Sequence, residues 1–85
     1  MNKIYKYQLG TVDTQSIIMK QGYKILDLQL QRGIPCVWVL IDPNNNNSLV
    51  EFRTYATGQT VDERSNEYIG SYQLYGGDAI FHVFI

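Results

Sequence analysis

Cysteine, histidine and charged residues are scarce in this sequence. Cys36 is the only cysteine, so no disulfide forms within the chain, which fits a protein of a reducing cytoplasm. His82 is the only histidine, whereas metal sites of the common kind need roughly two to four His, Cys or carboxylate ligands at short spacing. The scarcity of these side chains therefore predicts a protein without a metal and without a cofactor.

An excess of charge of one sign is also missing. The 85 residues carry a formal net charge of -1, without the Lys and Arg clusters that are typical of proteins that bind nucleic-acid polymers. No apolar run reaches the roughly 18 residues of a membrane span, and no basic segment precedes an apolar one as in a signal peptide. We therefore expect a single domain over residues 1–85 that does not enter the membrane, and whose small core favours a homo-oligomer.

No arrangement of residues typical of an enzyme is found. The phosphate-binding loop G-x-x-x-x-G-K-[ST] and the dinucleotide fingerprint G-x-G-x-x-G are both absent. A Cys36–His82 nucleophile pair would need the two side chains to meet, but Cys36 lies in an apolar run where a buried, unreactive thiol is the usual outcome. Asp62 and Glu63 are adjacent carboxylates in a polar segment and are expected to be solvated. The sequence predicts no catalytic residues and a protein that is not an enzyme.

What the sequence does hold is strand-like alternation, most clearly over residues 24–41, which predict a long β-hairpin. Its first arm alternates leucine with polar residues, and Arg32-Gly33 is the expected turn because glycine readily adopts a positive φ. A two-residue turn gives the pairs Gln31–Ile34, Gln29–Cys36 and Asp27–Trp38. The face expected to form the core then carries Leu26, Leu28, Leu30, Pro35, Val37, Val39 and Ile41.

Five further segments are predicted strands: residues 4–9, 15–19, 49–55, 67–74 and 79–85. Gly76-Gly77 predicts a second hairpin, in which the pairs are Ser71–His82, Tyr72–Phe81 and Gln73–Ile80. Residues 42–48 and 59–67 are polar connections, and the second has room for one helical turn at most. The pattern predicts an all-β protein, a small antiparallel barrel or sandwich of about six to seven strands built from hairpins.

Binding is better supported than catalysis. Arg53 and Tyr55 share one face of a predicted strand, and they offer a bidentate partner for phosphate or carboxylate and a stacking surface with a hydroxyl. Trp38 adds a second aromatic surface, and Gln73 and His82 in the last hairpin add polar edges. If these faces converge, they form a pocket suited to a nucleotide-like ligand, with phosphate on Arg53 and a base between Trp38 and Tyr55.

Each of these residues also has a purely structural interpretation. Arg53 would pair with Glu51 or Glu67 on the surface, Trp38 would belong to the core, and His82 would be a satisfied residue at a sheet edge. The seven tyrosines fit a contact surface, but they also fit strands, because aromatic side chains favour β-structure.

The end of the chain carries the most specific resemblance. Gly70-Ser71-Tyr72-Gln73-Leu74-Tyr75-Gly76-Gly77 is followed by Phe81-His82-Val83-Phe84, and residues 4–7, 33–43, 52–58 and 68–69 add to the match. Together these stretches resemble a family of small phage and prophage proteins of unknown function, over nearly the whole chain. The resemblance transfers no catalytic residues.

The phage context that the resemblance implies leads to a functional expectation. We expect a non-catalytic binding protein of the host cell cytoplasm that antagonises antiviral defence by sequestering a nucleotide-derived immune signal. Two alternatives remain open at this point: an inhibitor that binds a host protein through the tyrosine-rich surface, and a minor structural component of the virion.

Overall fold

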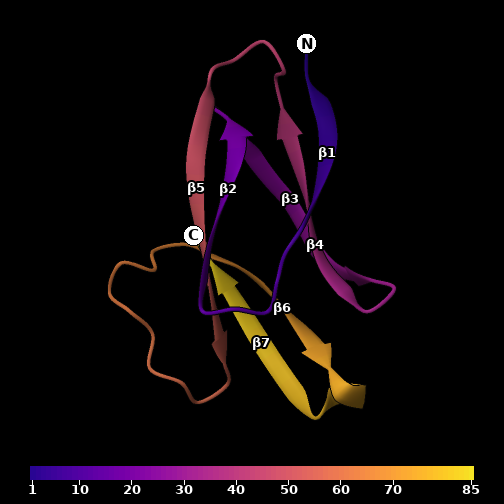
Figure 1. Ribbon diagram of the computed structural model, residues 1–85, viewed down its shortest axis with the longest axis vertical. Helices are drawn as coiled ribbons and strands as arrows, with labels where there is room; N and C mark the ends of the chain where they lie inside the picture. Colours follow the sequence, from indigo (N-terminus) through magenta and orange to yellow (C-terminus); the bar gives the residue numbers. More distant parts are fainter.

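The computed structural model describes residues 1–85 and consists of two antiparallel β-sheets (Figure 1). The first sheet has the order β1-β4-β3, with β1 at Lys3–Gln8, β4 at Ile34–Ile41 and β3 at Lys24–Gln31. The second has the order β2-β5-β7-β6, with bounds Thr14–Lys20, Asn47–Ala56, Ala79–Phe84 and Tyr68–Leu74 respectively. The prediction of an all-β protein is therefore confirmed. No helix in the structure is long and apolar enough to cross a membrane.

The central hairpin has the predicted register. Strands β3 and β4 pair Gln31 with Ile34, and Asp27 with Trp38, on either side of the Arg32-Gly33 turn. Both turn residues have positive φ values, 53° at Arg32 and 78° at Gly33, as a two-residue turn of type I′ requires. The turn chemistry alone was enough to predict this pairing.

The predicted core face of β3 is wrong in part, because this strand contains a β-bulge. The register shifts between Ile25 and Asp27, so Leu26 is an extra residue without a partner in β4. Leu26 is 44% exposed, and Ile25 packs against the core instead. Leu30, near the hairpin tip, is 37% exposed and is not a core residue either. The remaining predicted core residues are buried: Leu28, Pro35, Val37, Val39 and Ile41.

The core lies between the two sheets. Its buried cluster consists of Leu9, Met19, Leu28, Val37, Val39, Ile41, Val50, Phe52, Tyr72 and Val83. Strand β6 packs against β3 at Gly70, where a Cβ atom would lie 3.4 Å from Leu28 Cδ2, an ordinary van der Waals distance. The sheets are therefore held together by β3 and β6 at this crossing and by apolar side chains elsewhere.

The second hairpin, β6–β7, also has its predicted pairs, including Ser71 with His82. Its connection is longer than a glycine dipeptide, because Tyr75–Gly77 forms a short 3₁₀ turn (η1) before β7 begins at Ala79. A second bulge lies between Tyr68 and Gly70. It places Tyr68 opposite Phe84, on the outer face of the sheet, where an uninterrupted strand would turn Tyr68 toward the core.

Two connections differ in detail from the prediction. Strand β5 begins at Asn47, because Asn47 and Ser48 pair with Lys20 and Met19 of β2. Residues 57–67 contain no helix, only hydrogen-bonded turns at Thr57-Gly58 and Glu63-Arg64. This segment, which we call the covering loop, leaves β5, runs beside the second sheet and returns past the end of β7 to β6 (Figure 1), and it lines a pocket together with side chains of the sheet.

Candidate functional site

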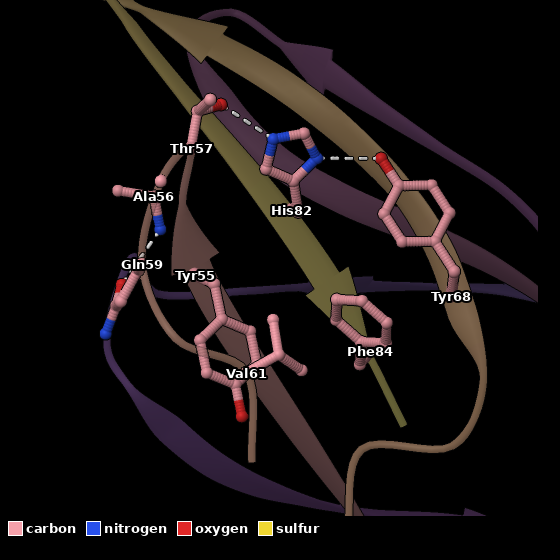
Figure 2. Close-up of a pocket in the computed structure, with 9 residues that line it drawn as sticks. Tyr55, Ala56, Thr57, Gln59, Val61, Tyr68, His82 and Phe84 are labelled. Carbon is pink, nitrogen blue, oxygen red and sulfur yellow. Dashed lines mark hydrogen bonds between the residues drawn. The ribbon is translucent and has the colours of Figure 1, made fainter. Parts of the chain in front are cut away.

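The outer face of the second sheet carries a pocket of about 210 Å³ (Figure 2). Its sheet residues are Tyr55 on β5, Tyr68 on β6, and His82 and Phe84 on β7; the covering loop adds Thr57, Gln59 and Val61. We call it the aromatic pocket. Alternation along β5 and β7 and the bulge in β6 place all four rings on the same face.

The four rings contact one another edge to face or tilted. Tyr68 and Phe84 have centroids 5.2 Å apart at 74°, and Tyr55 and Phe84 have centroids 5.7 Å apart at 81°. Tyr68 and His82 lie 5.9 Å apart at 38°. Edge-to-face contacts of this kind are favourable between aromatic rings.

Both ring nitrogens of His82 have partners. Its Nε2 lies 2.8 Å from the Thr57 hydroxyl and its Nδ1 lies 2.9 Å from the Tyr68 hydroxyl (Figure 2). A hydroxyl can donate or accept, so either neutral tautomer of the imidazole is satisfied here. The contacts hold the ring in place and link β7 to β6 and to the covering loop. Cys36 lies on the other sheet, buried, with its thiol directed at the Ile34 carbonyl, so no Cys–His pair forms.

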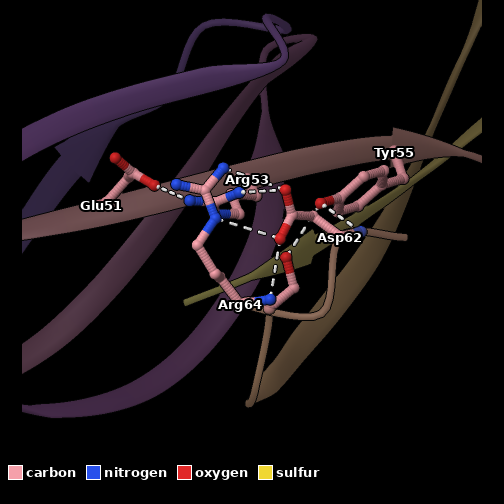
Figure 3. Close-up of polar contacts among 6 residues, drawn as sticks. Glu51, Arg53, Tyr55, Asp62 and Arg64 are labelled. Atoms are coloured by element: carbon pink, nitrogen blue, oxygen red, sulfur yellow. Dashed lines mark hydrogen bonds and ion pairs between the residues drawn. The ribbon is translucent and has the colours of Figure 1, made fainter. Parts of the chain in front are cut away.

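An ion-pair cluster holds the covering loop beside the pocket (Figure 3). Arg53, only 8% exposed, pairs with Glu51 on its own strand and with Asp62 of the loop at 3.3 Å. Arg64 binds the same Asp62 carboxylate at 3.0 Å. Hydrogen bonds from the Arg64 side chain and backbone N–H, with Arg53 adding to them, hold the pKa of the Asp62 carboxyl well below its usual range.

Tyr55 fastens the same loop from within the pocket. Its hydroxyl lies 2.9 Å from the Ser65 hydroxyl and accepts a hydrogen bond from the Asp62 backbone N–H at 3.1 Å. The contact with Ser65, followed by that with Asp62, lowers the pKa of the Tyr55 hydroxyl. Tyr55 therefore has two parts with different roles: a ring that lines the pocket and a hydroxyl that positions the loop.

The five predicted binding residues do not meet in one place. Tyr55 and His82 both line the aromatic pocket, and Arg53 lies next to it with its guanidinium held by Glu51 and Asp62. Gln73 is exposed on β6, beyond the pocket. Trp38 lies on the outer face of the other sheet, in register with Lys6 and Asp27. Contacts of all five residues with a ligand stay predictions.

Sequence reasoning missed several pocket residues. The register of the second hairpin places Phe84 on the face of His82, so this residue could have been found. Tyr68 could not, because its orientation depends on the bulge, and Thr57 and Val61 reach the pocket only through the path of the covering loop.

Two antiparallel sheets with an aromatic pocket on an outer face define the class: a small all-β domain with a candidate binding site. The chain belongs to the family described as domain of unknown function DUF7352, which matches residues 1–85. No curated protein and no solved structure matches this chain.

Proposed function

We propose that this protein is a phage-encoded, non-catalytic binding protein that sequesters a nucleotide-derived immune signal in the host cytoplasm and so antagonises antiviral defence. The aromatic pocket carries the proposal, because four rings around one opening suit the flat base of a nucleotide. The phage origin rests on the resemblance of residues 70–84 to small phage proteins.

The size of the pocket limits what it encloses. At about 210 Å³ it is smaller than the roughly 300–1,000 Å³ of sites that bury a whole drug-sized ligand. One base therefore enters, and the sugar and phosphate parts of the ligand stay outside. A second copy of the chain in a homo-oligomer would cover these outer parts.

Polar groups at the opening supply the recognition of the base. Gln59 uses its side-chain oxygen to accept the Ala56 backbone N–H at 3.0 Å, which leaves its amide nitrogen free to donate to a ligand. The hydroxyls of Thr57 and Tyr68, fixed by His82, each retain hydrogen-bonding capacity. Because His82 uses both ring nitrogens for these contacts, it serves in the proposal as a positioning residue rather than as a proton acceptor.

A second candidate function rests on the first sheet. Its outer face carries apolar side chains, among them Ile4, which is 62% exposed, with Ile34 and Trp38 on the adjacent strand β4. Such a face suits contact with a protein and supports the alternative of an inhibitor that binds a host protein.

Calorimetry with cyclic di-AMP, cyclic AMP and ADP-ribose tests the proposed function. We expect the wild-type protein to bind at least one of them, and Tyr68→Ala to lose at least about tenfold in affinity because it removes one wall and the His82 contact. Tyr75→Ala is the matched control, since Tyr75 is 77% exposed and lies outside the pocket.

Heating the protein purified from bacterial cells distinguishes a sequestering protein from an enzyme. A sequestering protein releases an intact nucleotide that mass spectrometry identifies, whereas a chemically altered product would show an enzyme. Binding of none of the three probes, together with release of no small molecule, would overturn the proposal in favour of the protein-binding inhibitor.

A further inference from the structure

A second pocket lies on the outer face of the first sheet, beside the β3–β4 turn. It has a volume of about 330 Å³ and is lined by Lys6, Gln8, Gln31, Arg32 and Ile34. We call it the basic pocket. It shares no residue with the aromatic pocket, which belongs to the other sheet.

The two cations of the basic pocket have no carboxylate partner. Neither Lys6 nor Arg32 forms an ion pair, in contrast to Arg53 and Arg64 beside the aromatic pocket. The only acidic residue on the strands of this face is Asp27, which does not line the pocket. Two positive charges that share an opening repel one another, and an anion between them would relieve this repulsion.

One of these cations is already positioned. Lys6 Nζ donates a hydrogen bond to Gln31 Oε1 at 2.6 Å, across the sheet from β1 to β3. An ammonium group has three donors, so two remain for a ligand. The amide groups of Gln8 and Gln31 can add neutral hydrogen bonds at the same opening.

The backbone at Arg32 is a second, independent observation. Its φ of 53° lies in the left-handed region, where Asn or Gly is favoured at the first position of a type I′ turn and arginine is not. Residues held in unfavourable backbone conformations concentrate at functional sites. An arginine at this position gives up local stability and places a guanidinium at the pocket.

We propose that the basic pocket binds the phosphate group of a small phosphorylated ligand. Arg32 supplies the planar, bidentate contact that suits phosphate, and Lys6 supplies a point charge from the opposite side. The basic pocket is separate from the aromatic pocket, so phosphate binding there does not depend on the proposed function.

Titration with inorganic pyrophosphate, followed by calorimetry, tests the site. Arg32→Asn removes the guanidinium but keeps the turn, because asparagine accepts the left-handed conformation; its melting temperature should equal or exceed that of the wild type. We expect this variant to lose about tenfold or more in affinity for pyrophosphate. Lys20→Gln is the charge-matched control, because Lys20 is an unpaired cation on β2 outside the basic pocket, and it should bind as the wild type does.

Two further arms define the ligand. ADP that binds as tightly as pyrophosphate shows a site that recognises phosphate alone, and Tyr68→Ala should leave pyrophosphate binding unchanged because Tyr68 lies in the other pocket. Equal affinities of the wild type and Arg32→Asn, or an equal loss in Lys20→Gln, would overturn the proposal. Binding of a single-stranded oligonucleotide without any binding of pyrophosphate would overturn it as well.

Discussion

At the scale of single residues, Asp62 connects the covering loop to the sheet. Its carboxylate forms ion pairs with Arg53 of β5 and with Arg64 of the loop, and its backbone N–H donates to the Tyr55 hydroxyl. Arg53 is nearly buried, so its charge needs these partners. Removing one of them should loosen the loop and, with it, one wall of the aromatic pocket.

We predict that Asp62→Asn destabilises the protein at pH 7 and that its difference from the wild type shrinks as the pH falls below about 4. The pKa of Asp62 is lower in the folded than in the unfolded protein. The carboxylate therefore adds its full contribution to the free energy of unfolding above the unfolded-state pKa, and this contribution is lost as the pH falls toward the folded-state pKa. Urea unfolding at several pH values measures the difference in the free energy of unfolding between the wild type and Asp62→Asn.

Asp78→Asn serves as the control for this pH experiment. The Asp78 side chain makes no ion pair, so its substitution should change stability little at any pH. A constant difference between wild type and Asp62→Asn from pH 7 to pH 2 would contradict the role given to this carboxylate.

At the scale of elements, two bulges decide which side chains face the core. The bulge in β3 replaces Leu26 with Ile25 on the inner face, and the bulge in β6 turns Tyr68 outward into the aromatic pocket. Hairpin registers were predictable from the turns, because a tight turn sets the pairing locally. The bulges were not, since they depend on how each strand packs against the opposite sheet.

Two leucines of the same strand provide a direct test of the β3 bulge. Leu28→Ala should lower the free energy of unfolding by about 2–5 kcal/mol, because Leu28 is buried against Gly70 where β3 and β6 cross. Leu26→Ala should cost less than about 1 kcal/mol, since Leu26 is 44% exposed and lies outside the core. Chemical denaturation measures both values, and equal costs would contradict the bulged register.

At the scale of the whole molecule, charge is divided between the two sheets. Of seven Lys and Arg side chains, only Arg53 and Arg64 form ion pairs, and both belong to the second sheet and its covering loop. Four of the others lie on the first sheet and its turn: Lys3, Lys6, Lys24 and Arg32. The free positive charge is therefore concentrated on the sheet that lacks the aromatic pocket.

Native mass spectrometry of the protein from bacterial cells tests association and ligand binding together. We predict a homo-oligomer, because an 85-residue chain buries a small core and the flat molecule, 15 Å thick at its thinnest, exposes apolar side chains on its faces. We also predict a co-purified adduct of nucleotide size. A monomer without an adduct at micromolar concentration would contradict both predictions.

The sequence by itself determined the all-β class and the pairs within both hairpins, such as Asp27–Trp38 and Ser71–His82. Alternation and turn residues act over a few positions, so they can be read locally. Only the tertiary structure decided that β1 pairs with β4 and β5 with β7, that the covering loop pairs with a nearly buried Arg53, and that Trp38 and His82 lie on different sheets. These features depend on contacts between segments distant in sequence, and the free energy of such contacts cannot be predicted from local patterns.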